Sequence, residues 1–404
     1  MDIDAQVELL MQGTAYGDEN LHRTMALELR ERIIEAQSAG RKLRVYCGYD
    51  PRKPDLHLGH TVTMRKLRQF QDLGHEVLFV VGTYTSLIGD PSDQDKLRPI
   101  LTPQQADDYA RTYAEQAFRI LDREITVVRY NSEWLSKLTF ADLIQLASNF
   151  TIQQFLTRDA FRQRWERGDS IYLHETFYSI MQGYDAFMLQ ADVQIGGTDQ
   201  LFNIVTASRK VMVSLGARPN VAIILGILPG TDGVLKMSKS LGNHIPISTN
   251  AADMYGKVMS IPDIAMPSFC RLVTRWTPDQ IAQFEESIHT GALHPRDAKM
   301  RLAREITGTF YDDTAAQSAE EKFVNLFHEH AVPETIPTFT CLPGQTVLDV
   351  LVACGAVATR NGGRRLIEQN GVRYEGLVVT ESGMEFQKPG ILQAGKRKFY
   401  RILV

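Results

Sequence analysis

The sequence predicts an α/β protein in which a parallel sheet is followed by a helical segment and a small α+β module. Two almost entirely apolar runs, 43–47 and 76–81, flank the helical pattern 61–73. Apolar strands separated by a helix are typical of a parallel sheet that is buried on both faces. From about residue 250 the apolar strands give way to helical periodicity, and short strand patterns return only after 370. We therefore expect a sheet-containing part, a helical part and a C-terminal part, in that order.

The composition is typical of a globular protein without membrane spans. Of the 404 residues, 44% are apolar and 23% are charged, and no apolar run reaches the roughly 18 residues that a spanning helix needs. The N-terminus lacks the basic and then apolar pattern of a secretory signal, so we expect a cytoplasmic protein. The four cysteines are far apart and form no metal-ligand pair, which favours reduced thiols and argues against a metal site.

The first part alternates helices and strands. Residues 3–36 have the pattern of amphipathic helix, and the strand 43–47, the helix 61–73 and the strand 76–81 follow. The sequence predicts a helix with Thr102 as its N-cap and Pro103 in its first position, and then the strand 125–129. The phenylalanine-rich helical segment 140–161 suits either a core or a subunit interface. Helix 174–189, a strand that ends in two glycines, a helix from Thr198 and the apolar strand 221–225 complete this part.

The remaining chain is first helical and then mixed. Residues 250–328 show helical patterns only, and the three prolines in 331–343 indicate a linker. The last sixty residues predict helices at 345–355 and 360–369 and short strands at 372–374, 377–379 and 397–403.

Two histidines stand at the start of the helix that follows the first strand. His57 and His60 flank Gly59, so the segment forms a strand, a loop and a helix N-terminus. Such a junction binds anionic ligands in open α/β sheets. The imidazoles can donate hydrogen bonds to phosphate oxygens, and a glycine lets a planar ring approach the backbone. Alone, the four residues could equally be a solvent-facing helix start.

A second motif lies after the strand 221–225. Lys236-Met237-Ser238-Lys239-Ser240 follows a glycine-rich turn, and by itself it could be a solvated basic loop. The two motifs together, in this order, resemble the two ATP-gripping motifs of class I aminoacyl-tRNA synthetases.

The helix 174–189 carries a polar stripe. Tyr178, Gln182 and Asp185 fall at i, i+4 and i+7 and therefore lie on one face. A polar stripe usually faces solvent, but apolar residues border this one, which suits the wall of a pocket better.

The net charge of −4 does not indicate a nucleic-acid-binding protein as a whole. Any RNA contact must come from a local cluster, and basic residues gather near the C-terminus. The candidates for RNA contact are Arg360, Arg364, Arg365, Lys396, Arg397 and Lys398.

Further segments make the resemblance specific to the bacterial tyrosyl-tRNA synthetase family. They follow in the family's order: 46–51, 57–60, 89–92, Asn131, the stripe of helix 174–189, 196–200 and 236–240. The resemblance implies a Rossmann-like catalytic domain at 1–230, with a dimer-interface insertion at about 131–165. It further implies an ATP loop and linker at 231–250, a helical anticodon-binding domain at 251–332, a linker at 333–343 and an S4-type RNA-binding domain at 344–404.

The resemblance also implies roles for single residues. Tyr46 and Asp185 would bind the phenol of L-tyrosine, and Thr85, Asp90, Tyr178 and Gln182 would hold its α-ammonium group, with Asn131 close by. Gln200 would reach the α-carboxylate and Asp199 the ribose of ATP. His57, His60, Lys236 and Lys239 would stabilise charge on the phosphates during transfer. The full ATP set implied is Gly48, Asp50, His57, Gly59, His60, Gly197, Asp199, Lys236, Met237, Ser238 and Lys239.

The implied activity is that of a tyrosine-tRNA ligase. The carboxylate of tyrosine attacks the α-phosphorus of ATP, pyrophosphate leaves, and tyrosine is then transferred to the 3′ end of tRNA(Tyr). The carboxylate is already a nucleophile, so the protein's contribution is positioning and charge stabilisation. Mg²⁺ would accompany the nucleotide, with no tightly bound cofactor, and the family forms homodimers.

Three alternatives stay open at this point. A tryptophan enzyme shares the architecture, although an indole N–H only donates and would leave Tyr46 without a task. A non-enzymatic RNA-binding relative would have no need of the loop histidines and lysines, and a plain nucleotidyltransferase would have no need of the C-terminal module. The chain also departs from the family after Ser92, so a phosphate contact of Lys96 or Arg98 is uncertain, and the same holds for an ATP contact of Arg52.

Overall fold

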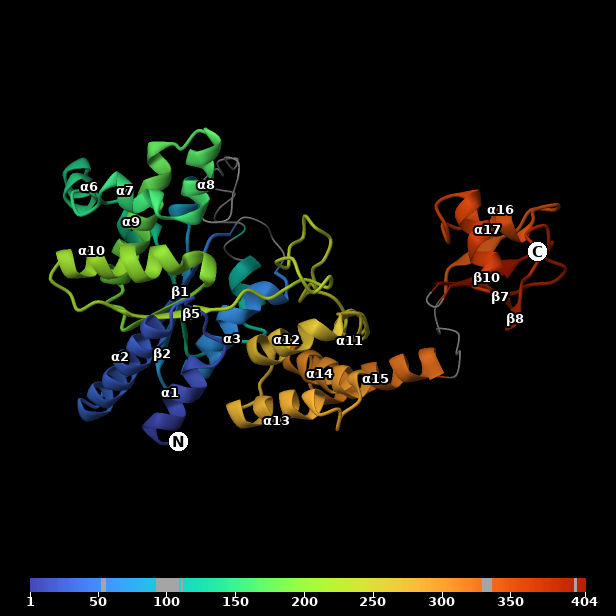
Figure 1. Cartoon of the computed structure of the whole chain (residues 1–404), viewed down its shortest axis with the longest axis horizontal. Helices are drawn as coiled ribbons and strands as arrows, with labels where there is room; N and C mark the ends of the chain where they lie inside the picture. Colours follow the sequence, from blue (N-terminus) through green and yellow to red (C-terminus); the bar gives the residue numbers. More distant parts are fainter. Residues whose placement is uncertain (52–55, 92–108, 110–111, 329–335, 396–397) are drawn as a thin grey trace. The chain divides into compact units, whose positions relative to one another are not determined.

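The computed structural model describes residues 1–51, 56–91, 109, 112–328, 336–395 and 398–404 (Figure 1). The chain divides into two compact units, Met1–Glu320 and Glu321–Val404. The predicted domain boundaries at 230, 250, 332 and 343 stay predictions. In the described part of the chain, no helix is both long and apolar enough to cross a membrane.

The first unit is built on a five-stranded parallel sheet, which confirms the predicted fold class. Its strands are β1 (Arg44–Tyr49), β2 (Glu76–Val81), β3 (Thr126–Tyr130), β4 (Val193–Gly197) and β5 (Val221–Leu225). They lie in the order β3-β2-β1-β4-β5, and every neighbouring pair is parallel. The chain therefore winds outward from β1 in one direction and then returns to the other side of β1. The change of direction lies between β1 and β4, where open α/β sheets bind their ligands.

Side chains alternate between the two faces of the sheet. On one face Tyr46, Leu78 and Val80 pack against α5 (Ser132–Leu135), α9 (Leu173–Met188) and α10 (Arg209–Ser214). On the other face Tyr49 stacks on Phe79 with ring centroids 4.4 Å apart, and its hydroxyl contacts Thr63 of α3 (Leu58–Asp72). Both faces are covered, which explains why β2 and β5 are almost entirely apolar.

Two predicted helical segments are divided in the structure. Residues 3–36 form α1 (Ile3–Met11) and α2 (Glu19–Ser38), because Gly13 and Gly17 between them adopt φ of +77° and +72° and turn the chain. The segment 140–161 forms α6 (Phe140–Ala147), α7 (Ile152–Leu156) and the start of α8 (Asp159–Arg167). Thr139 caps α6 at the predicted start of this segment, and Thr151 caps α7 and so begins a new helix within it. The predicted start at Thr102 lies outside the described residues.

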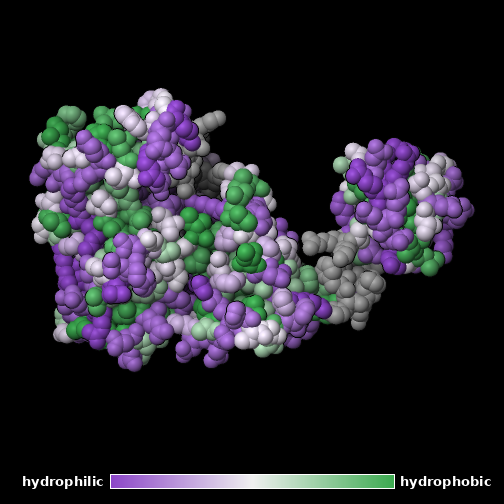
Figure 2. All heavy atoms as spheres, in the orientation of Figure 1, coloured by the Kyte–Doolittle hydropathy of each residue, from purple (hydrophilic) through white to green (hydrophobic). Residues whose placement is uncertain are grey.

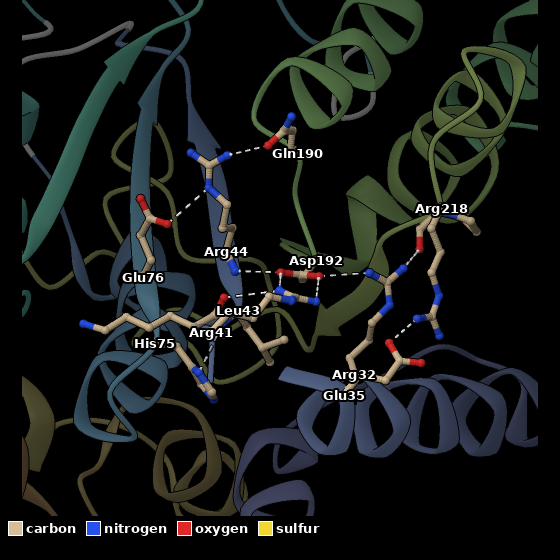
Figure 3. A network of polar contacts seen from close by, with 12 residues as sticks. Arg32, Glu35, Arg41, Leu43, Arg44, His75, Glu76, Gln190, Asp192 and Arg218 are labelled. Atoms are coloured by element: carbon tan, nitrogen blue, oxygen red, sulfur yellow. Dashed lines mark hydrogen bonds and ion pairs between the residues drawn. The ribbon is translucent and has the colours of Figure 1, made fainter. Parts of the chain in front are cut away.

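A buried ion cluster around Asp192 lies at the amino ends of β1 and β4, opposite the expected ligand site (Figure 3). Asp192 accepts from the guanidinium groups of Arg32 and Arg41 at 2.9 and 2.7 Å and from the backbone N–H of Arg44 at 2.9 Å. Burial raises the pKa of Asp192, but the bonds from Arg41 and Arg44 outweigh burial and hold it below its ordinary value. The cluster ties α2 to the starts of β1 and β4.

Helices continue after the sheet. They are α11 (Ala251–Met259), α12 (Met266–Val273), α13 (Pro278–His289), α14 (Pro295–Phe310) and α15 (Asp313–His328). The contact between α3 and α12 joins them to the sheet-containing part.

The second unit is a small α+β module. Its sheet has the order β6-β10-β9-β7-β8, antiparallel except for the pair of β6 with β10. The strands are β6 (Thr338–Thr340), β7 (Val372–Tyr374), β8 (Leu377–Val378), β9 (Gly390–Ala394) and β10 (Lys398–Leu403), and the helices are α16 (Val347–Ala353) and α17 (Arg360–Glu368). The sequence predicted β7, β8 and β10 of this sheet but not β6 and β9.

Candidate active site

The residues expected to act together follow the carboxyl ends of four neighbouring strands. Asp50 follows β1, Thr85 lies just after β2, Asn131 follows β3, and Asp199 and Gln200 follow β4. Because the strands are parallel, these ends meet at one edge of the sheet, around the change of direction between β1 and β4.

The two histidines cap α3 reciprocally. His57 is the N-cap residue, and its Nδ1 accepts from the backbone N–H of Gly59 at 3.2 Å, while Nδ1 of His60 accepts from the backbone N–H of His57 at 3.2 Å. A neutral imidazole whose Nδ1 accepts carries its proton on Nε2. Burial lowers the pKa of His57 to about 2 and of His60 to about 4, and the nearby cations act in the same direction. Both rings are therefore neutral Nε2–H donors near pH 7.

The lysine loop lies against the histidine loop. The backbone N–H of Leu58 donates to Ile245 O at 3.0 Å, and that of Ile247 donates to Leu56 O at 3.2 Å. A Cβ on Gly59 would lie 3.5 Å from the Cβ of Met237. The two motifs, far apart in sequence, are thus adjacent in the fold.

Lys236 and Asp199 form an ion pair with Nζ and Oδ2 3.1 Å apart. The loop itself is shaped by Asn243, which sequence reasoning did not single out. Its Oδ1 accepts from the backbone N–H of Ser238 at 2.8 Å, and its Nδ2 donates to Lys236 O and to Asp232. Asn243 therefore fixes the turn that presents Lys236 and Ser238.

Gly48, at the end of β1, is exposed, and a Cβ there would meet nothing within 4 Å.

Tyr46 of β1 and Asp185 of α9 are both buried on the face of the sheet that α9 covers. The carboxylate of Asp185 accepts from Trp134 Nε1 at 2.6 Å and from Asn131 Nδ2 at 3.2 Å. Burial raises the pKa of Asp185 to about 7 against these two hydrogen bonds, which lower it. Burial and then the charge of Asp185 raise the pKa of Tyr46 well above its ordinary value, and the Tyr46 hydroxyl donates to Gln182 O at 3.2 Å. Trp134 is a partner that no sequence signal indicated.

A second polar group lies around Asp50. Its carboxylate accepts from Thr85 Oγ1 at 2.8 Å and from the Tyr178 hydroxyl at 3.1 Å. The resemblance implies a role in ATP binding for Asp50 and in amino-acid binding for the other two, and these roles stay predictions; the structure joins Asp50 to both residues by hydrogen bonds. Oε1 of Gln182 is buried with no hydrogen-bond partner. An orphaned acceptor of this kind suits a donor that a ligand brings.

Asp90 accepts a hydrogen bond from Nε2 of Gln200, and Arg158 lies 3.7 Å from its other oxygen. Gly197 allows Asp199 to lie close to the backbone, since a Cβ there would be 2.5 Å from Asp199 Oδ1. Within the described ranges, no group of three or more histidine, cysteine or acidic side chains could hold a metal ion.

A family model described as tRNA synthetases class I (W and Y) matches residues 37–328, which include the whole edge described above. The chain belongs to this class I tRNA synthetase family. It is therefore an aminoacyl-tRNA synthetase.

Curated relatives agree with the family assignment over nearly the whole length. A tyrosine-tRNA ligase of Moorella thermoacetica is 44% identical over 378 residues, covering 93% of this chain and 91% of the relative. A tyrosine-tRNA ligase of Thermotoga maritima is 42% identical over 374 residues, covering 92% and 93%.

Solved structures agree in fold. A truncated mitochondrial tyrosyl-tRNA synthetase of Aspergillus nidulans has a TM-score of 0.61 at 22% identity and covers 80% of this chain and 94% of that one. A tyrosyl-tRNA synthetase of Archaeoglobus fulgidus has a TM-score of 0.59 at 20% identity, covering 79% and 100%.

The C-terminal basic residues differ in how the structure uses them. Arg364 and Arg365 of α17 are exposed. Arg360 forms an ion pair with Asp349, and Lys398 Nζ donates to Gly355 O and Ala356 O at 3.1 and 2.7 Å. Lys396 and Arg397 lie outside the described residues. Charge along the sequence alone does not separate these cases.

Proposed function

We propose that this synthetase activates L-tyrosine with ATP, forming tyrosyl-adenylate and pyrophosphate, and transfers tyrosine to the 3′ end of tRNA(Tyr). The observation that carries the amino-acid specificity is the buried pair of Tyr46 and Asp185. A phenol hydroxyl both donates and accepts, so it can donate to the carboxylate and accept from the Tyr46 hydroxyl. The names of the relatives, 39–44% identical, support the same amino acid.

Phenylalanine brings no hydroxyl, so the acceptor positions of Asp185 that Trp134 and Asn131 do not occupy would gain no partner. A buried donor or acceptor without a partner costs its full desolvation energy, so the analogue is rejected at binding. Tyrosine-specific synthetases are the standard example of such rejection without an editing site.

The α-ammonium group of tyrosine would lie between the carboxylate of Asp90 and the acceptors near Asp50. The buried Oε1 of Gln182 supports this location, because an ammonium donor would satisfy it. Thr85 and Tyr178 would contribute oxygens, and Gln200 would reach the carboxylate end of the substrate.

In the first step the substrate carboxylate attacks the α-phosphorus of ATP. His57 and His60 would donate from Nε2 to phosphate oxygens as neutral groups, and Lys236 and Lys239 would add positive charge. Interactions that strengthen as charge moves onto the leaving pyrophosphate accelerate the step rather than merely tightening binding. Lys236 would exchange Asp199 for phosphate when the loop closes over ATP, leaving Asp199 for the ribose. Mg²⁺ would arrive with the nucleotide and neutralise charge on its phosphates.

We also propose a homodimer. Large apolar side chains are exposed over α6 and α7 (Figure 2), among them Phe140 at 77%, Ile144 at 56% and Ile152 at 58%. A partner subunit would cover this surface. Ile144→Glu should give a monomer in light scattering, while Ile264→Glu, at an 81% exposed site elsewhere, should not.

The exposed Arg364 and Arg365 support a tRNA contact by the C-terminal module, and the reaction with tRNA suits a cytoplasmic location. ATP–pyrophosphate exchange with each of the twenty amino acids tests the proposed function. We expect exchange with tyrosine and transfer to tRNA(Tyr). Exchange with tryptophan and none with tyrosine would overturn the specificity, and exchange with no amino acid would overturn the activity.

A further inference from the structure

Five polar side chains form a closed ring beside the tyrosine pocket. Arg158 Nη1 donates to Ser179 Oγ at 3.0 Å, and Ser179 Oγ donates to Asn203 Oδ1 at 2.7 Å. Asn203 Nδ2 donates to Gln200 Oε1 at 2.9 Å, and Gln200 Nε2 donates to Asp90 Oδ2. Arg158 Nη2 lies 3.7 Å from Asp90 Oδ1 and closes the ring.

The ring has a fixed direction. A guanidinium group only donates, so the Ser179 oxygen must accept from Arg158 and its hydrogen must point to Asn203 Oδ1. Asn203 then turns its NH₂ group toward Gln200, which must accept with its oxygen and turn its own NH₂ group toward Asp90. Arg158 therefore determines the orientation of two amides along the ring, those of Asn203 and Gln200.

Arg158 places a positive charge in a buried position. Its side chain is 4% exposed. It packs on Phe161 and Phe202, with the guanidinium carbon 4.8 and 5.3 Å from the ring centroids. A buried cation is expensive unless it is paired and hydrogen-bonded. A carboxylate within ion-pair distance of Arg158 is that of Asp90, which is 18% exposed at its side chain and belongs to the proposed ammonium site.

We propose that Arg158 is a positioning residue for the amino-acid substrate. It holds the carboxylate of Asp90 in one orientation, directly and through Ser179, Asn203 and Gln200, whose NH₂ group donates to Asp90. It acts on the α-ammonium group of tyrosine through Asp90 and touches no substrate atom itself. This inference rests on the proposed function.

The test measures equilibrium binding of three ligands to the full-length protein. Tyrosine has both the ammonium and the carboxylate group, tyrosinol keeps only the ammonium, and 3-(4-hydroxyphenyl)propionate keeps only the carboxylate. Arg158→Met should weaken tyrosine and tyrosinol alike, by about tenfold or more as for a lost charge-assisted contact, and leave the propionate within about twofold. The KM for ATP should not change.

Arg164→Met is the matched control. Arg164 lies on α8, its side chain is 5% exposed, and it pairs with Glu175 at 2.6 Å, outside the ring. Its loss should lower stability without separating the three ligands. Ser179→Ala keeps the cation and breaks the ring, so it should give the Arg158→Met pattern in weaker form, and it provides the test if Arg158→Met does not fold.

Each other outcome overturns the proposal. Equal weakening of all three ligands would mean that Arg158 only supports the fold. Loss with tyrosine and the propionate but not with tyrosinol would mean a direct contact with the carboxylate. Absence of tyrosine binding by the unmodified protein would overturn the proposed function itself, and this is seen before any variant is compared.

Discussion

Gly82 permits the closest packing in the proposed amino-acid site. It follows β2 directly, and a Cβ there would overlap both Asp50 Oδ1 and Thr85 Oγ1. Its φ is not in the left-handed region, so the reason for glycine is space alone. Gly82→Ala would push Asp50 away from Thr85 and Tyr178, to which it is bonded at 2.8 and 3.1 Å.

The size of the effect follows from these contacts. Overpacking a dense site costs about 1–3 kcal/mol, and a lost hydrogen bond to a charged group costs about 1.5–3 kcal/mol. If the site yields by losing one such bond, kcat/KM for tyrosine should fall about tenfold to a hundredfold, since about 1.4 kcal/mol is a factor of ten. If Asp50 keeps both hydrogen bonds, the strain should instead lower the thermal stability of the Gly82→Ala variant.

The assay is tyrosine-dependent ATP–pyrophosphate exchange together with thermal unfolding. Gly256→Ala in α11 is the control, because its Cβ would meet nothing within 4 Å. It should leave kcat/KM unchanged and stabilise the protein by about 0.5–1 kcal/mol. Gly82→Ala with unchanged kcat/KM and unchanged stability would refute the packing argument.

Three further outcomes are expected. Because burial lowers the pKa of His57 and His60 to about 2 and 4, the kcat/KM for ATP, which reports groups of the free enzyme, should show no inflection near pH 6.5 that these imidazoles cause; an inflection there that His60→Asn removes would contradict this. As the pH decreases through about 7, the kcat/KM for tyrosine should decrease because Asp185 becomes protonated. Trp134→Phe removes a hydrogen bond that lowers the pKa of Asp185, so it should move the inflection to a pH about one to two units higher. An inflection that does not move would belong to another group. Arg364→Glu with Arg365→Glu should raise the KM for tRNA at least about tenfold and leave exchange unchanged, whereas Arg23→Glu, an exposed control on α2, should alter neither; equal loss of charging and exchange would argue against a tRNA role.

The sequence predicts the parallel sheet well because its strands are mostly apolar, and β2 and β5 are almost entirely buried, although the residues of β3 are at most partly buried. The strands around 43–47, 76–81, 125–129, 194–197 and 221–225 are all present. The divisions of predicted helices at Gly13, Gly17 and Thr151 depend on local turns and caps, which interrupt the helical periodicity only briefly.

The sequence predicts those parts of the candidate site that consist of short motifs. It does not predict the parts that depend on packing between distant segments. The histidine and lysine loops could be recognised from residue order, but their mutual contact required the fold. Trp134, Arg158 and Gly82 gave no signal, because their partners come from distant parts of the chain. The hydrogen bonds of Asp50 to Thr85 and Tyr178 depend on the fold in the same way, and the assignment of Asp50 to ATP stays a prediction.

The most direct test of the central claim is a crystal structure with L-tyrosine bound. We expect the phenol oxygen within hydrogen-bond distance of both the Tyr46 hydroxyl and the Asp185 carboxylate, and the ammonium group near Asp90 and Gln182 Oε1. A carboxyl group of Asp185 turned away from the cavity that contains Tyr46, or a phenol bound elsewhere, would contradict the assigned specificity.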